Sequence, residues 1–334
     1  MKLIRTSDTE PGYRRQRCGR GFRYLAPDGS RLAAGEDLDR IRSLAIPPAY
    51  RSVWICLPPN GHLQATGRDD RDRKQYRYHP EWMEIRNQLK FEMLLDFAHA
   101  LPGIRRSLDG IIARRTLNEE TATAVALAII DRTGARVGNA AYRDEHGTYG
   151  ITTLAREHAE IHGRAVELCY IGKHGKEVHL RLDQPALARH LSHCHELAGQ
   201  SLFSYPDDDG TVRHVDSGMV NELIHELSCD EFSAKTFRTW RGSLLAFNHL
   251  ATAAWPESAR ERKSLEVAAV RSAANGLFNT MATSRKYYVH PIITGTWMDG
   301  TFPALLEKAA RSRAFSDLRT LEERRFARFL KVAG

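Results

Sequence analysis

Hydrophobic and polar positions alternate in two different ways along this chain, and the change falls near residue 80. Between residues 20 and 80, short apolar or aromatic runs alternate with turn sequences, as in GFRYLAPDGSRL, RSVWICLPPNGHLQATG and KQYRYHP. The PDG and PNG segments are typical of tight turns between antiparallel strands. This pattern predicts a small antiparallel β-sheet in the N-terminal part of the chain.

From about residue 81 onward, apolar residues recur at steps of three and four, which indicates amphipathic helices. The segments with this spacing include EWMEIRNQLKFEMLLDFAHAL, TLNEETATAVALAIIDRTG, PALARHLSHCHELAG and VNELIHELSC. Residues 150–183 instead alternate with period two on both sides of GKHGK, so we expect a β-hairpin within the helical region. The sequence thus predicts an α+β protein with a small, β-rich domain at residues 1–80 and a larger, mostly helical domain at residues 81–334.

The composition is that of a globular protein, with 42% hydrophobic and 27% charged residues among 334. The longest apolar run, residues 121–130, is far shorter than the roughly 20 residues that a membrane span needs. The first residues lack the apolar segment of an export signal. Five widely spaced cysteines without a CxxC motif favour reduced thiols. We therefore expect a cytoplasmic protein.

The net charge of +8 suggests a polyanionic partner, because phosphate neutralisation releases counterions and drives binding. Charge alone is equally compatible with a protein that binds no acidic partner. The basic residues gather in two N-terminal clusters. The first contains Arg14, Arg15, Arg17, Arg20 and Arg23, and the second contains Arg68, Arg71, Arg73, Lys74 and Arg77.

Several further cations occupy positions suited to phosphate chemistry. One expected helix begins after Asn118, a typical N-cap residue, and ends at Gly134. Arg136 lies in RTGARVGN, between this helix and Gly138, where irregular backbone can direct a side chain. Lys173 and Lys176 flank the tip of the expected hairpin. Lys235 and Arg238 lie three residues apart on one helix face, and a guanidinium can grip two phosphate oxygens at once. Taken singly, each of these cations is more typical of a solvated surface.

Two adjacent tyrosines, Tyr287 and Tyr288, lie in NTMATSRKYYVHP. A phenol has a pKa near 10, so ionising it at neutral pH costs about 4 kcal/mol. Nearby cations reduce that cost and also stabilise the extra negative charge of a phosphate under attack. Adjacent helical residues differ in direction by about 100°, so only one phenol can face a phosphate. This physical argument does not select between the two tyrosines, and a packed aromatic pair is the structural alternative.

Metal and nucleotide sites are not indicated. His190 and Cys194 share a helix face, but two potential ligands do not make a structural zinc site. PDDDG, at residues 206–210, lacks the spaced ligands of a calcium loop. Neither GxGxxG nor a P-loop occurs. We expect no cofactor and no metal.

Taken together and in order, these stretches resemble the poxvirus-like type IB DNA topoisomerases found in bacteria. The resemblance covers roughly residues 20–295. The matching segments are GRDDRDRKQYRYHP, RVGN, YGITTL, IGKHGK, GQSLFSY, FSAKTFRTWRGS and NTMATSRKYYVHP.

The resemblance implies roles for individual residues. Arg136 and Arg238 would contact the scissile phosphate, with Lys235 as an auxiliary cation. Lys173, the first lysine of GKHGK, would protonate the departing 5′-hydroxyl. Tyr288, directly before VHP, would be the nucleophile, and Tyr287 would serve in packing.

The position nine residues before the nucleophile departs from the poxviral pattern. Poxviral members carry histidine there, whereas this chain has Asn279, whose amide can donate a hydrogen bond but cannot become cationic. In the N-terminal domain, Tyr76 and Tyr78 lie on one face of a strand by period two and resemble the family's DNA-contacting aromatics. The implied DNA-binding set is Arg68, Arg73, Lys74, Tyr76, Tyr78 and Lys235.

The resemblance further implies that residues 1–80 form a DNA-binding domain and residues 81–334 a catalytic domain, in a clamp-like monomer. It implies that the enzyme relaxes supercoiled duplex DNA through a transient 3′-phosphotyrosyl intermediate, without ATP or metal. The expected location is the cytoplasm, on the nucleoid. One alternative is a tyrosine recombinase, although those enzymes typically carry histidine where this chain has Lys235 and have a helical N-terminal domain. A non-catalytic DNA-binding protein is the other alternative, because charge alone fits it equally well.

Overall fold

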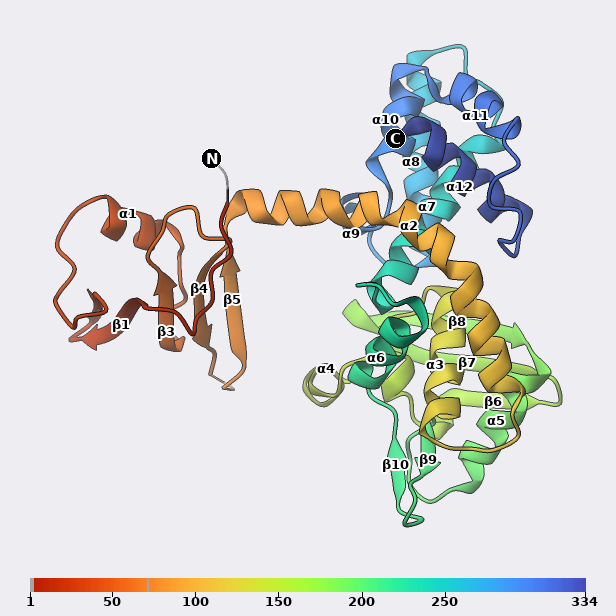
Figure 1. Cartoon of the computed structure of the whole chain (residues 1–334), viewed down its shortest axis with the longest axis horizontal. Coiled ribbons are helices and arrows are strands. Elements are labelled where there is room, and N and C mark those ends of the chain that lie inside the picture. Colours follow the sequence, from red (N-terminus) through yellow and green to blue (C-terminus); the bar gives the residue numbers. More distant parts are fainter. Residues whose placement is uncertain (1–2, 71) are drawn as a thin grey trace. The chain divides into compact units, whose positions relative to one another are not determined.

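The chain folds into two compact units, Met1–Leu89 and Lys90–Gly334. The computed structural model, shown in Figure 1, describes residues 3–70 and 72–334, without the side chains of residues 83, 84 and 86. Arg71 of the second basic cluster therefore lies outside the described residues. Residue 80, the expected domain boundary, is the first residue of α2 (Pro80–Ala113), a 34-residue helix whose first ten residues belong to the first unit.

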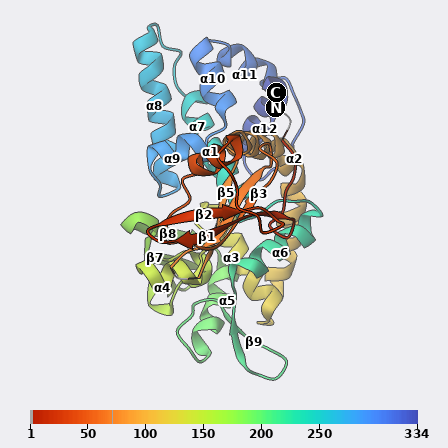
Figure 2. The same cartoon turned by 90° about the vertical axis from the view of Figure 1, so that its left-hand side faces the viewer.

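The first unit contains the antiparallel sheet that the sequence predicts. Its five strands lie in the order β2-β1-β3-β4-β5, and every neighbouring pair is antiparallel. Figure 2 shows strands of this sheet from a second direction. The strands are β1 (Gly12–Cys18), β2 (Gly21–Leu25), β3 (Arg51–Cys56), β4 (Leu63–Arg68) and β5 (Lys74–Tyr78).

Both faces of this sheet bury apolar side chains. Successive residues of a strand point to opposite faces. Val53 and Ile55 pack with Ile41 of α1 (Glu36–Ser43) in one cluster, whereas Trp54 and Cys56 belong to a second cluster. The apolar run of β3 therefore contributes to two small cores.

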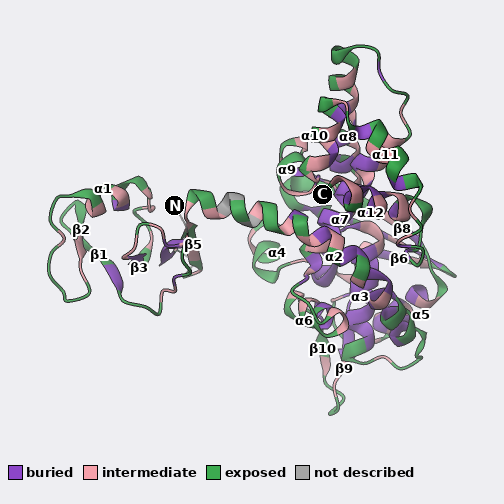
Figure 3. Cartoon of the chain, turned by 45° about the horizontal axis from the view of Figure 1, so that its top comes forward, coloured by how far each residue is buried: buried purple, intermediate pink, exposed green. Residues whose placement is uncertain are grey.

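The second unit is mostly helical, and its buried residues form one large core (Figure 3). Its helices after α2 are α3 (Glu119–Thr133), α4 (Ala140–His146), α5 (Pro185–Glu196), α6 (Ser217–Ser228), α7 (Ala234–Ala251), α8 (Ala259–Gly276), α9 (Met281–Tyr287), α10 (Pro291–Asp299), α11 (Phe302–Ala310) and α12 (Leu321–Ala333). Single 3-10 turns occur at Ile151–Thr153, Arg156–His158 and Lys173–Gly175. The α7 and α8 helices pack side by side, and α3 is buried along almost its whole length.

The ends of α3 follow the sequence signals. The Asn118 side chain accepts a hydrogen bond from the Thr121 N–H at 3.0 Å, which caps the first turn. Gly134 ends the helix with a φ of 68°, a left-handed conformation that glycine adopts without steric cost. The chain then leaves the core in irregular backbone, and Arg136 lies in that stretch.

The β-hairpin expected within residues 150–183 is present, with one more strand than expected. The hairpin consists of β7 (Ala165–Gly172) and β8 (Lys176–Asp183), and β6 (Ala159–His162) extends it into a three-stranded sheet. A second small ladder joins β9 (Ser204–Pro206) to β10 (Val212–His214) around the PDDDG turn. Over the described part of the chain, no helix combines the length and apolar character needed to cross a membrane.

Candidate active site

Tyr288 lies where the chain leaves α9, and α7 holds its backbone in place. Ser243 on α7 donates its hydroxyl to the Tyr288 carbonyl at 3.0 Å and accepts the His290 N–H at 3.0 Å. Gly242 supplies room for this contact, because a Cβ there would lie 2.8 Å from the Tyr288 carbonyl oxygen. Close packing of α7 against residues 288–290 therefore fixes the backbone of Tyr288.

Arg238 lies beside the Tyr288 ring. It is 4% exposed, and its Cζ lies 5.0 Å from the ring centroid. The guanidinium donates to the carbonyl of Gly134 and, at 3.3 Å, to that of Leu277. These carbonyls orient the group, while its Nε has no hydrogen-bond partner among the described residues.

Arg136 and Asn279 form a hydrogen-bonded pair from distant parts of the chain. The Arg136 guanidinium donates to the Asn279 Oδ1 at 3.2 Å and to the Phe278 carbonyl at 3.5 Å. Phe278 has a φ of 50°, an uncommon conformation for a bulky residue. Burial, with repulsion from Arg238, lowers the pKa of Arg136 to about 10, so the side chain stays cationic at neutral pH.

The YGITT segment supports the backbone on which Arg136 sits. The Ile151 N–H donates to the Arg136 carbonyl at 2.8 Å. Gly150 packs directly on Gly138, and a Cβ on Gly150 would lie 2.6 Å from the Gly138 backbone. Gly138 itself has a φ of 112°. Both glycines are therefore required by a close backbone crossing, which explains two of the motifs seen in the sequence.

Lys173 reaches the same region from the hairpin between β7 and β8. The tip turns tightly because His174 and Gly175 both have positive φ, at 65° and 69°. The Lys173 Nζ lies 5.1 Å from the centroid of the Tyr142 ring, a cation–π contact with α4. Of the two hairpin lysines that the sequence offered, Lys173 lines the central pocket, and Lys176 lies on β8 with an exposed side chain.

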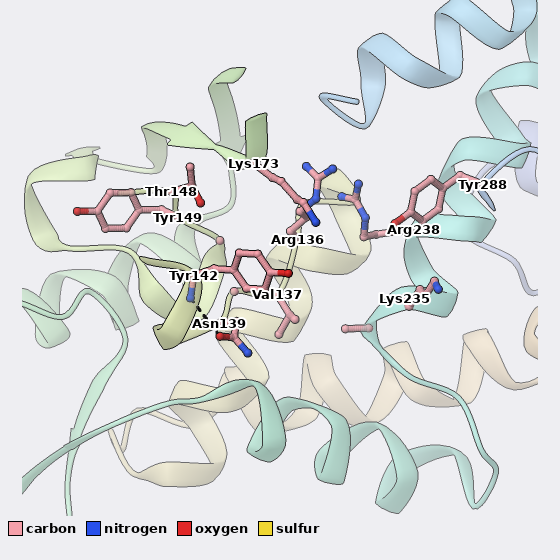
Figure 4. A pocket seen from close by; sticks show the side chains of 13 residues that line it. Arg136, Val137, Asn139, Tyr142, Thr148, Tyr149, Lys173, Lys235, Arg238 and Tyr288 are labelled. Atoms are coloured by element: carbon pink, nitrogen blue, oxygen red, sulfur yellow. Dashed lines mark hydrogen bonds between the residues drawn. The ribbon is translucent and has the colours of Figure 1, made fainter. Parts of the chain in front are cut away.

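These side chains surround one pocket of about 240 Å³. Figure 4 shows Arg136, Lys173 and Arg238 together, with the Tyr288 ring beside Arg238. The lining residues are Arg136, Val137, Gly138, Asn139, Tyr142, Thr148, Tyr149, Gly150, Lys173, Ala234, Lys235, Arg238 and Tyr288. Four cations thus share a cavity with the Tyr288 ring, a composition suited to an anion whose charge increases during a reaction.

The surrounding charges also act on the phenol. Burial raises the pKa of Tyr288, but the charge and hydrogen bond of Arg238, with the charges of Lys235 and Arg136, outweigh it. The net pKa lies below the usual value of a tyrosine. Deprotonation of this phenol is therefore easier than in water, as a nucleophile requires.

Two protein families match the chain. The family described as eukaryotic DNA topoisomerase I, catalytic core, matches residues 79–291, a stretch that includes every residue lining the pocket. The N-terminal domain of bacterial DNA topoisomerase IB matches residues 21–69. The chain belongs to the type IB DNA topoisomerases. It is therefore an isomerase whose substrate is duplex DNA.

A curated relative supports the same membership. This topoisomerase is 29% identical over 285 residues to the DNA topoisomerase 1B of Acanthamoeba polyphaga mimivirus. The match covers 83% of this chain and 85% of the viral protein. The similarity therefore extends over both units and not only over the catalytic core.

The proposed DNA-binding cations of the first unit already have partners. Arg68 pairs with Asp72 at 3.0 Å, Arg73 with Asp69 at 2.9 Å. Lys74 pairs with Asp8 at 2.6 Å. Each would have to exchange a carboxylate for a phosphate in order to contact DNA.

The two aromatic residues of β5 differ in their surroundings. Their rings stack at 6.1 Å between centroids, as expected for neighbours two positions apart on one strand face. Tyr76 is 49% exposed, whereas Tyr78 packs against the small cluster around Trp54. Tyr76 is therefore the more accessible of the two.

Sequence reasoning missed four residues around the tyrosine: Lys90, Tyr142, Gly242 and Ser243. Gly242 and Ser243 follow Arg238 within the quoted FSAKTFRTWRGS segment, so their proximity to the site was available as a signal. Lys90 and Tyr142 come from α2 and α4, and no local pattern marks them.

Proposed function

We propose that Tyr288 is the nucleophile of a DNA strand-transfer reaction. Its phenol oxygen loses a proton to solvent and attacks a backbone phosphorus, forming a 3′-phosphotyrosyl ester as the P–O5′ bond breaks. The departing 5′-oxygen takes a proton from Lys173 and leaves as a hydroxyl. The nicked end rotates and supercoils relax. The hydroxyl then attacks the phosphotyrosine, and the original bond is restored.

The observation that carries this proposal is the convergence of Arg136, Lys173, Lys235 and Arg238 on the pocket that holds the Tyr288 phenol. The two guanidiniums would contact the non-bridging phosphate oxygens, where charge accumulates in the transition state. Asn279 would contribute a hydrogen bond. Its Oδ1 is already occupied, and its buried Nδ2 has no partner among the described residues.

Neither ATP nor a metal is required by this scheme. The phosphotyrosyl ester conserves the energy of the bond that was broken, so religation needs no energy source. The positive charge that stabilises the transition state comes from the chain's own side chains. We infer that the first unit binds DNA through Arg68, Arg73, Lys74, Tyr76 and Tyr78, and that the enzyme acts as a monomer on the cytoplasmic nucleoid.

Relaxation of a supercoiled plasmid in EDTA without ATP tests the reaction. The proposal predicts a ladder of topoisomers. A protein that only binds DNA would retard the plasmid and leave its linking number unchanged. A recombinase would need paired sites and give joined products.

Two conservative variants test the choice of nucleophile. Tyr288→Phe should bind DNA yet form no covalent complex and relax no plasmid, because the attacking oxygen is gone. Tyr287→Phe is the matched control, since it removes the neighbouring hydroxyl and keeps a ring that contacts Lys90, Lys235 and Lys286. It should retain most of the activity, and the reverse result would assign the reaction to Tyr287.

A further inference from the structure

A lysine of α2 holds the backbone next to Tyr288. The Lys90 Nζ donates to the carbonyl oxygen of Tyr287 at 2.6 Å, across 197 residues of sequence. The same ammonium lies 4.3 Å from the centroid of the Phe91 ring and 5.2 Å from that of Tyr287. This hydrogen bond and these cation–π contacts hold the ammonium in position.

Two further lysines and a neutral imidazole lie near Lys90 among the residues whose side chains are described. Lys235 on α7 and Lys286 on α9 lie 6.0 Å and 5.4 Å from the centroid of the same Tyr287 ring. His290 packs on Phe91 with 5.1 Å between ring centroids, and burial lowers its pKa to about 4, so it is neutral at physiological pH. Burial and repulsion from Lys235 lower the pKa of Lys90 to about 7.

The end of α9 needs such an external support. The helix has only seven residues, and a helix this short is not stable without tertiary contacts. Ser243 and Gly242 fix the Tyr288 carbonyl from the α7 side. Lys90 fixes the preceding carbonyl from the α2 side, so the two contacts together set the direction in which Tyr288 leaves the helix.

We propose that Lys90 is a positioning residue for DNA cleavage, which holds the Tyr287 carbonyl so that the Tyr288 phenol is aligned with the scissile phosphate. This inference rests on the proposed role of Tyr288 as nucleophile. Lys90 touches no reacting atom, and it acts through the backbone of α9.

Single-turnover cleavage of a duplex oligonucleotide by the full chain tests the proposal. Lys90→Met keeps the length of the side chain and removes the donor. We expect cleavage to slow by about 10- to 100-fold, since a misplacement of about 1 Å costs on that order, while the Kd for the same duplex changes little. Lys308→Met, an exposed lysine on α11 outside the pocket, is the control and should cleave at the wild-type rate. A Lys90→Met rate within twofold of wild type would overturn the proposal.

The pH dependence separates positioning from a general loss of folding. As pH rises from 6 to 8.5, Lys90 loses its proton and becomes a weaker donor, so the advantage of wild type over Lys90→Met should shrink. Lys90→Arg keeps a donor that stays charged across this range. Lys90→Arg should cleave close to the wild-type rate at pH 6. At pH 8.5 it should cleave faster than wild type, because its guanidinium keeps its charge while Lys90 loses its own. If Lys90→Met does not fold, an Arg variant whose profile matches wild type would still contradict the proposal.

The same experiment distinguishes this inference from the proposed function. Wild-type enzyme that forms no covalent adduct at Tyr288 would refute the nucleophile assignment itself. Wild-type enzyme that forms the adduct, together with Lys90 variants that cleave normally, would refute only the positioning role.

Discussion

Asn279 uses the two ends of its amide differently. The oxygen accepts hydrogen bonds from Arg136 at 3.2 Å and from the Thr280 N–H at 3.0 Å, while the buried nitrogen has no partner within the described chain. A buried donor without a partner costs about 1–3 kcal/mol, and a phosphate oxygen bound in the pocket would satisfy it. At this scale we propose that the protein holds Asn279 and the two arginines as donors for an anion.

Asn279→Asp separates the two ends of the amide. Aspartate keeps an acceptor for Arg136 and Thr280, loses the amide donors and adds negative charge beside the phosphate. We expect single-turnover cleavage to fall by about 10²- to 10³-fold, the usual effect of removing one such donor, with little change in melting temperature. Asn275→Asp, an exposed change on α8, adds the same charge and should have a far smaller effect. If both variants lost cleavage activity equally, the added negative charge and not the missing amide donor would be the cause.

The α7 helix packs closely against the Tyr288 backbone at the end of α9. Gly242 lies in the interior of α7, where glycine is less favourable than alanine by about 1 kcal/mol. A glycine at this position accommodates the close approach of Tyr288.

Glu266 on α8 also anchors α9. It is 1% exposed and forms ion pairs with Arg285 of α9 and, at 2.9 Å, with Lys263.

Gly242→Ala should slow cleavage although alanine has a higher helix propensity than glycine. The added Cβ would lie 2.8 Å from the Tyr288 carbonyl oxygen and 3.0 Å from its Cβ, so the tyrosine must shift. We expect cleavage to slow by about 10- to 100-fold in a single-turnover assay, with the protein still folded. Gly295→Ala on α10 is the matched control, because no atom lies within 4 Å of the added Cβ. It should leave cleavage unchanged, and equal slowing in both variants would exclude the steric explanation.

For the molecule as a whole, a buried ion cluster connects the C-terminal helix to the core. Arg105 on α2 donates to both oxygens of Asp131 on α3 and to both oxygens of Glu323 on α12, at 2.8–2.9 Å. All three side chains are buried. Burial raises the pKa of Glu323, but the hydrogen bonds and charge of Arg105 outweigh burial and lower it overall.

Glu323→Gln should therefore destabilise the second unit. Removing one charge of a buried cluster costs about 3–5 kcal/mol, which corresponds to a melting temperature lower by roughly 6–20 °C. Because the folded pKa lies below the ordinary 4.5, the contribution is complete above that pH and is lost as pH falls through the folded pKa. The difference between variant and wild type, measured by circular dichroism, should therefore be large at pH 7 and shrink in acid. Glu322→Gln, an exposed neighbour, should melt like wild type at both pH values.

The sequence by itself determined the features that depend on neighbouring residues. Short apolar runs separated by turn sequences predicted the sheet of the first unit, and the capping residue Asn118 and Gly134 marked the ends of α3. Local propensities and side-chain periodicity are properties of a few consecutive residues, so they are readable without a fold. The motif pattern also selected five of the residues that line the pocket: Arg136, Lys173, Lys235, Arg238 and Tyr288.

Only the tertiary structure decided which distant groups meet. Nothing local in EWMEIRNQLKFEMLL marks Lys90 as the partner of a carbonyl 197 residues away, and α2 and α9 must pack before that bond exists. The same holds for β6, which becomes a strand by pairing with β7. The two tyrosines differ for this reason as well. Tyr288 lines the pocket beside Arg238, and Tyr287 lies among three lysines, because packing against α7 and α2 sets the direction of each side chain.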